Sequence, residues 1–71
     1  MERFGEKLHI LRTKQGLTGK QLATALELKS RSHITELEKG RRIPSTPLLL
    51  KISLFFDVCA DRLIRDDLEL D

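Results

Sequence analysis

The chain has 71 residues, a size at which one hydrophobic core gives only marginal stability and pairing with a second copy is common. Aromatic residues make up 4% of the sequence and Trp and Tyr do not occur, so the core must consist mainly of leucine and isoleucine, which favours helices over a β-sandwich. Its one cysteine, Cys59, excludes an internal disulfide, and no stretch resembles a signal peptide or a membrane span. We therefore expect an all-α, cytoplasmic domain.

The charge is unevenly distributed along the chain. The net charge is +2, but residues 1–44 carry ten Lys and Arg against five Asp and Glu, whereas residues 45–71 carry three against six. A basic half indicates a side that faces phosphate groups, although a mixed, solvated surface has a similar composition.

Two amphipathic helices begin the chain. The first is expected over residues 2–15 and ends at Gly16; its apolar stripe consists of Phe4, Leu8 and Leu11. The second opens at Thr18, which forms a capping box with Gln21 three residues later; its buried side consists of Leu22, Ala23 and Leu26.

A third helix is expected between Ser30, as N-cap, and Gly40, where the chain leaves in a left-handed turn. Ile34 and Leu37 fall on one side of it, and the opposite side is polar, formed by Ser32, Thr35, Glu36 and Lys39. Because only residues 27–29 separate it from the second helix, the two form a helix-turn-helix over about residues 18–39. A polar helix face followed by Lys39, Arg41 and Arg42 indicates DNA as partner.

The fourth helix is capped by Ser45, carries Pro47 in its first turn and ends at Asp57. Its expected core stripe is Leu49, Ile52, Ser53 and Phe56, yet it is apolar nearly all round, which predicts burial on more than one side. We expect the second cover to be another copy of the chain, in a homodimer whose interface consists of Leu48, Leu54, Phe55, Leu63 and Ile64. A single deeper core is the alternative.

The end of the chain is expected to be less ordered. A short fifth helix is predicted over residues 60–64, which completes a domain of residues 1–65. An acidic tail over residues 66–71 is expected to fray. Cys59, just before the fifth helix, is expected to be a small buried apolar side chain.

Glu38 lies about 40° from Ile34 around the third helix, on its packed side, where an unpaired carboxylate is costly. Arg12, beside the apolar stripe of the first helix, is positioned to pair with it. We therefore predict a partly buried ion pair between Arg12 and Glu38 that joins these helices.

Several motifs occur in a fixed order: Gly16-Leu17-Thr18, Leu22-Ala23, Ser30 with Ile34, Leu37-Glu38-Lys39-Gly40, and Pro44-Ser45. Together, over about residues 4–64, they resemble the DNA-binding domain of the phage-repressor and Cro class, the XRE-type regulators. The resemblance implies a compact, five-helix, lambda-repressor-like fold and the same pairing of Arg12 with Glu38. It also implies a homodimeric transcriptional regulator, by expectation a repressor, on a palindromic or near-palindromic operator.

In this family the start of the recognition helix contacts base edges. Carried over to this chain, the expected base contacts are Arg31, Ser32, Thr35 and Glu36, with Arg31 on guanine and Glu36 on the cytosine amino group. The expected phosphate contacts, whose loss should weaken all sequences alike, are Lys20, Lys29, Lys39, Arg41 and Arg42. The alternative is that these are ordinary solvated residues.

The chain departs from the family pattern at three points. The turn is one residue longer and has Glu27 in place of glycine, Gly19 stands where glutamine is frequent, and Cys59 replaces a serine cap. An antitoxin, a protein-binding adaptor and the controller protein of a restriction-modification system are alternative functions for the same fold. We expect no enzyme activity, cofactor or metal, and His9 and His33 are expected to be surface residues.

Overall fold

Five α-helices form the described part of the chain, which is residues 1–70 of a computed structural model; Asp71, the last residue of the expected tail, lies outside it. The helices are α1 (Phe4–Lys14), α2 (Gly19–Ala25), α3 (Arg31–Glu38), α4 (Thr46–Phe56) and α5 (Ala60–Ile64). The expected all-α, five-helix fold is confirmed. None of these helices is long and apolar enough to cross a membrane.

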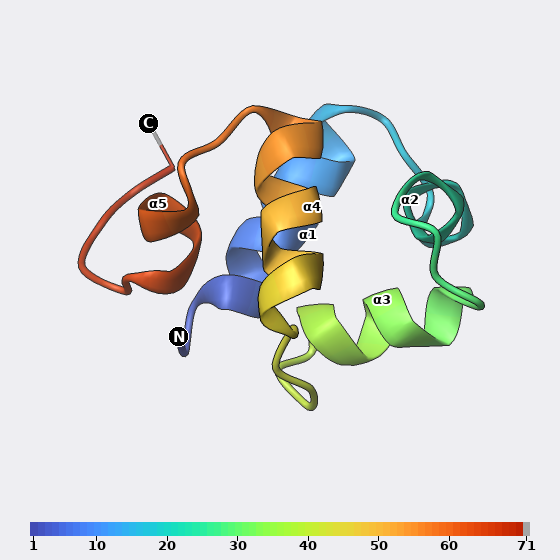
Figure 1. Cartoon of the computed structure of the whole chain (residues 1–71), viewed down its shortest axis with the longest axis horizontal. Helices are drawn as coiled ribbons and strands as arrows, with labels where there is room; N and C mark the ends of the chain where they lie inside the picture. Colours follow the sequence, from blue (N-terminus) through green and yellow to red (C-terminus); the bar gives the residue numbers. More distant parts are fainter. Residues whose placement is uncertain (71) are drawn as a thin grey trace.

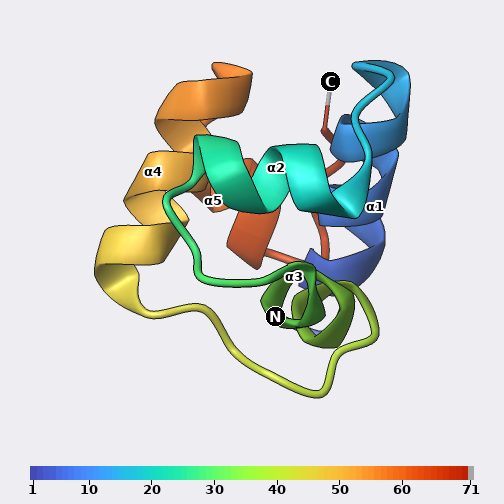
Figure 2. The same ribbon diagram turned by 90° about the vertical axis from the view of Figure 1, so that its right-hand side faces the viewer.

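The helices surround one core. In Figure 1, α4 lies in front of α1 at the centre, α2 and α3 lie on one side, and α5 lies with the N-terminus on the other; Figure 2 shows that α4 and α1 stand on opposite sides of α2. Figure 2 shows α2 crossing above α3, which is seen along its axis. Because α3 packs against both α2 and α1, its remaining side faces outward.

All five helices contribute to the core, whose buried apolar members are Phe4, Leu8, Leu22, Ala23, Leu26, Ile34, Leu37, Leu48, Ile52, Phe56 and Leu63. Two of these residues correct the sequence prediction. Leu48 and Leu63 are 7% and 0% exposed within the single chain, so neither can form the surface of a dimer. The buried stripe of α4 runs through Leu48, Ile52 and Phe56 at four-residue spacing, and Leu49 is only partly buried.

The expected N-caps of α2 and α4 are confirmed. Gln21 N donates to Thr18 Oγ1 at 3.1 Å and Thr18 N donates to Gln21 Oε1 at 2.9 Å, which completes the capping box. Ser45 Oγ accepts from the amide of Leu48 at 3.3 Å. Ser30 occupies the N-cap position of α3, but the prediction that its hydroxyl caps the helix is wrong, because within residues 1–70 it makes no capping hydrogen bond.

The turn between α2 and α3 accommodates Glu27 in the left-handed region, at φ 61°. The Glu27 amide donates to the carbonyl of Thr24 at 3.1 Å and the Leu28 amide donates to that of Ala23 at 2.8 Å, the two bonds of a Schellman motif. Lys51 on α4 also forms an ion pair with Glu27 at 3.1 Å. These contacts hold the longer turn in place without the usual glycine.

Gly5 allows the backbones of α1 and α3 to meet. A Cβ atom at this position would lie 2.4 Å from the carbonyl oxygen of Glu38 and 2.6 Å from that of Leu37. Only a residue without a side chain fits there. The end of α3 is therefore placed directly against the first turn of α1.

The expectation that residues 66–70 fray is wrong, because the segment is bound to α1. The Asp66 carboxylate accepts hydrogen bonds from the amides of Glu2 at 3.0 Å and Arg3 at 2.9 Å. These bonds from Arg3 and Glu2 lower the pKa of Asp66. Asp66 thus satisfies amides just before α1 that the helix itself leaves open.

Lys7 holds the same segment from inside. Its side chain is buried, and Nζ donates to the carbonyl oxygens of Arg62 at 2.6 Å, Arg65 at 2.8 Å and Leu68 at 2.7 Å. A cation suits this place because the last carbonyls of α5 carry partial negative charge. Lys7 therefore joins α1 to α5 and to the tail.

Candidate nucleic-acid interface

The polar face of α3 is open. Ile34 and Leu37 are buried on the opposite side of the helix and anchor it to the core. Arg31, Ser32 and Thr35 are exposed. The predicted contact face is therefore free to meet a partner.

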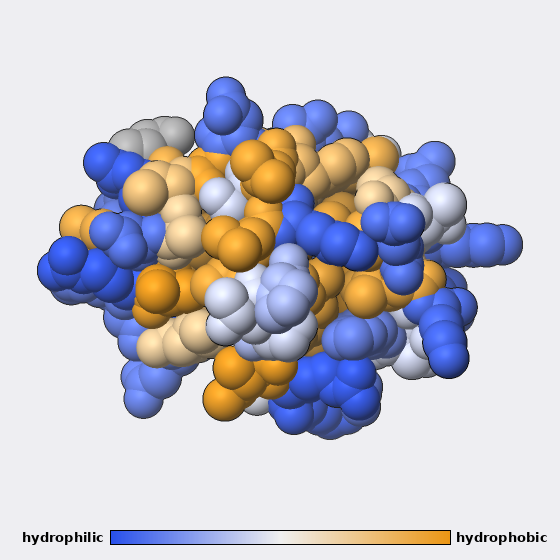
Figure 3. All heavy atoms as spheres, viewed as in Figure 1, coloured by the Kyte–Doolittle hydropathy of each residue, from blue (hydrophilic) through white to orange (hydrophobic). Residues whose placement is uncertain are grey.

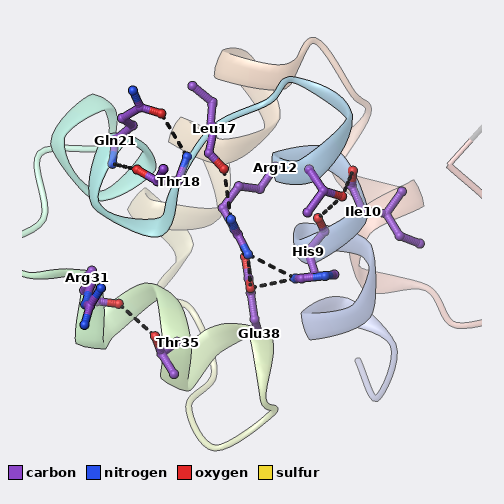
Figure 4. A network of polar contacts seen from close by, with 10 residues as sticks. His9, Ile10, Arg12, Leu17, Thr18, Gln21, Arg31, Thr35 and Glu38 are labelled. Carbon is purple, nitrogen blue, oxygen red and sulfur yellow. Dashed lines mark hydrogen bonds and ion pairs between the residues drawn. The ribbon is translucent and has the colours of Figure 1, made fainter.

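The four expected base-contact residues lie together on this face. Thr35 Oγ1 donates to the carbonyl of Arg31 at 3.2 Å, which orients its hydroxyl along the helix (Figure 4). The start of α2 stands beside Arg31, since a Cβ atom at Gly19 would lie 3.8 Å from the Arg31 Cβ. The Glu36 side chain is 46% exposed and forms an ion pair with Arg42, with Oε1 and Nε 3.6 Å apart.

Cationic residues flank α3 at both ends. The exposed members are Lys20 in α2, Lys29 in the turn, and Lys39, Arg41 and Arg42 after the helix. Among them Arg42 differs from its neighbour Arg41, because it is paired with the carboxylate of Glu36. Exposed cations beside an open helix face are suited to phosphate contacts.

The predicted pair of Arg12 and Glu38 is present behind this face (Figure 4). Arg12 Nε donates to Glu38 Oε2 at 2.6 Å and Nη2 donates to Oε1 at 3.1 Å, while Nη1 donates to the carbonyl of Leu17 at 2.9 Å. The two side chains are only 17% and 11% exposed. This pair therefore fixes the end of α3 to α1 and to the start of the helix-turn-helix.

His9 also joins this network, although its position on the outer side of α1 suggested an ordinary surface residue. Its Nδ1 lies 3.0 Å from Glu38 Oε1. Burial alone would raise the pKa of Glu38, but the hydrogen bonds from Arg12 and His9 outweigh burial and lower it. Glu38 is therefore held in its charged form.

A second exposed surface lies on α4. Its apolar residues are Leu50, Leu54 and Phe55, which are 52%, 82% and 44% exposed, and we call them the α4 patch. Figure 3 shows apolar surface over the centre of this view, where α4 lies. Leu54 and Phe55 belong to the expected dimer interface, and Leu50, which was not part of that prediction, is exposed on the same helix. Ile64, also expected there, is half-buried.

Cys59 corrects another expectation. It is an exposed free cysteine, not a buried apolar side chain, and it occupies the N-cap of α5 without making a side-chain capping bond among the described residues. Within residues 1–70, no group of three or more His, Cys, Asp or Glu side chains is placed to hold a metal ion.

The geometry defines a class of protein. A short turn joins α2 to α3, and α3 has a buried apolar side and an open polar face between cations. This arrangement is that of a helix-turn-helix DNA-binding domain. Residues 8–62 match the helix-turn-helix family, and the chain belongs to it. Its helix-turn-helix is of the XRE type.

A curated relative supports this membership. The chain is 44% identical over 64 residues to the HTH-type transcriptional activator BcrR of Enterococcus faecalis. The match covers 90% of this chain and 31% of the relative, so the chain spans about a third of the length of that protein.

Solved structures share the fold. The restriction-modification controller protein C.AhdI from Aeromonas hydrophila is 33% identical, with a TM-score of 0.77, and the match covers 89% of this chain and 94% of that one. The P22 c2 repressor, solved with synthetic operator 9T, is 23% identical, with a TM-score of 0.83, and the match covers 90% and 96% of the two chains. The likeness to the P22 c2 repressor concerns the fold alone.

Proposed function

We propose that this chain binds a palindromic or near-palindromic operator as a homodimer, with α3 in the major groove. The observation that carries this proposal is the open polar face of α3, which Ile34 and Leu37 hold from behind. Arg31 would grip guanine O6 and N7, Ser32 and Thr35 would contact neighbouring base edges, and Glu36 would accept from cytosine N4. Lys20, Lys29, Lys39 and Arg41 would contact phosphate. With DNA as partner, the domain would act in the cytoplasm.

Selection of bound fragments from a random duplex pool tests this proposal. A specific site should bind on the order of a thousandfold more tightly than random duplex, and the affinity should fall steeply with salt. Equal binding to every duplex would contradict sequence recognition.

The variant Arg31→Ala should lose its preference at one base pair, by about tenfold, because each bidentate contact contributes about 1–3 kcal/mol of discrimination. The measurement is the affinity for the selected site and for its three substitutions at each position. Arg65→Ala is the matched control, since Arg65 is exposed and follows α5, away from α3 (Figure 1). An unchanged preference in Arg31→Ala would remove this residue from the base contacts.

The α4 patch is the proposed dimer contact, because it is the apolar surface that α4 does not bury within the chain. Two copies joined there would place two recognition helices in successive major grooves, about 34 Å apart. Leu54→Asp should give a folded monomer in analytical ultracentrifugation and lower operator affinity, since Leu54 is 82% exposed and contributes little to the core. A dimer that survives this change would place the interface elsewhere.

We propose repression by occlusion of a promoter as the regulatory outcome. Activation is the alternative favoured by the identity with BcrR, which is named an activator. A role as controller protein is favoured by the likeness to C.AhdI, and neighbouring restriction and modification genes would support it. The position of the selected operator relative to the promoter separates repression from activation.

A further inference from the structure

Glu36 is an unusual residue to find on a surface that faces DNA. It lies on the outer side of α3 with Ser32 and Thr35, and its side chain is 46% exposed. Phosphate groups repel a carboxylate through their charge. A base contact by Glu36 therefore requires a cation that offsets this repulsion.

Arg42 supplies that cation from the loop after α3. Its Nε forms an ion pair with Oε1 of Glu36 at 3.6 Å, a separation longer than a hydrogen bond. The two residues help to line a hollow of about 450 Å³ beside α3, which Ser32 and His33 also line. The positive charge of Arg42 thus offsets the negative charge of the Glu36 carboxylate and leaves its oxygens available to a donor.

We propose that Arg42 is a positioning residue for base recognition: it holds the Glu36 carboxylate toward the amino group of a cytosine in the major groove. This inference rests on the proposed function, in which α3 enters the groove. The earlier expectation was that Arg42 contacts phosphate and that its loss weakens binding to all sequences alike. Here Arg42 also determines which base is preferred at one position. Arg41, exposed and next to it, keeps the purely phosphate role.

The base pair concerned is found first. Bound fragments are selected from a random duplex pool, once with the wild type and once with Glu36→Gln. The base pair at which the two selected sets differ is the one that residue 36 contacts. Glutamine both donates and accepts, so a shift from cytosine toward adenine is expected there. A preference identical in both proteins at every position would overturn the assignment of Glu36 as a reader.

Arg42→Ala is then measured on the four duplexes that differ at that base pair. The preference for cytosine should fall at least about fivefold, the lower end of what one base contact contributes. Arg42→Lys, which keeps the charge, should retain overall affinity and recover part of the preference. Arg41→Ala is the matched control and should weaken all four duplexes by one common factor, with a salt slope smaller by about one.

The double variant tests whether Arg42 acts through Glu36. In a Glu36→Gln background, Arg42→Ala should reduce binding to all four duplexes equally, because no carboxylate remains to be positioned. An equal reduction in the wild-type background as well would leave Arg42 a phosphate contact and overturn the inference, while specific DNA binding would stand. Absence of any selected site in the wild type would instead remove the proposed function. Melting temperatures within a few degrees of wild type exclude misfolding as the cause.

Discussion

Lys7→Met is expected to destabilise the domain by about 4 kcal/mol, because the carbonyls of Arg62 and Leu68 lose their donor and each such loss costs about 1–3 kcal/mol. The Arg65 carbonyl keeps a second donor, the Leu68 amide, at 3.2 Å. Lys7 is 1% exposed, and its Nζ donates to the carbonyls of Arg62, Arg65 and Leu68. Because methionine fills a similar volume, the change in unfolding free energy reports the lost charge and hydrogen bonds and not a change in packing. A domain of this size has a total stability of roughly 4–11 kcal/mol, so much of it would be lost.

Urea denaturation followed by circular dichroism measures this effect. Lys14→Met is the matched control, since Lys14 lies on the same helix with its side chain exposed, and its unfolding free energy should change by less than about 0.5 kcal/mol. Hydrogen exchange in Lys7→Met should rise first at residues 65–70, which Lys7 holds against α1. A decrease in the unfolding free energy of Lys7→Met below about 1 kcal/mol would mean that water replaces the hydrogen bonds of the ammonium group without cost.

Glu38→Ala is expected to cost about 3 kcal/mol, toward the low end of the effect of breaking a buried ion pair, because Arg12 keeps its charge without its partner. The expected fall in melting temperature is about 12–24 °C for a domain of this size. Glu36→Ala is the matched control: that carboxylate is also paired with an arginine, but it is exposed, and exposed pairs contribute at most about 1 kcal/mol.

A double-mutant cycle separates the pair from its surroundings. Arg12→Ala combined with Glu38→Ala should cost less than the sum of the single changes, since no unpaired charge remains in the double variant. Strict additivity would show that the two side chains stabilise the fold independently.

The same pair gives the stability a pH dependence. The folded-state pKa of Glu38 is lowered from its ordinary value of 4.5, so its contribution is complete above that value and is lost as the pH falls through the folded-state pKa. Wild type should therefore lose more stability than Glu38→Ala below about pH 4.5. Parallel pH profiles of the two proteins would contradict this.

Sequence patterns predicted the features that depend on local spacing. The capping box of Thr18 and Gln21 needs only a three-residue separation, and the helix-turn-helix follows from two short helices joined by a short turn. The contact of Arg12 with Glu38 could also be predicted, since each lies beside an apolar stripe and one charge needs the other.

Features that depend on distant backbone groups were not predicted. Lys7 lies three residues after Phe4 and four before Leu11, on the core stripe of α1, and this position was the available signal that its side chain is buried. Its partners, however, are carbonyls 55 to 61 residues away, which no spacing reveals. The contact of Gly5 with α3 depends equally on how two helices cross.

The apolar surface of α4 was predicted only in part. An apolar pattern nearly all round a helix indicates that more than one side is covered. The pattern does not indicate which residue faces which side. In the structure Leu48, and not Leu49, faces the core together with Ile52 and Phe56. Leu50, Leu54 and Phe55 were therefore left outside.

The contact at Gly5 also limits how this domain adapts to DNA. Because the backbone of α1 touches the last carbonyls of α3, the recognition helix cannot tilt backward without displacing the whole N-terminal helix. In the proposed complex, operators of different curvature would conform to this fixed helix, and the energy of deforming each sequence would contribute to the choice among them. Selected sites should accordingly favour flexible base steps even where no side chain reaches them.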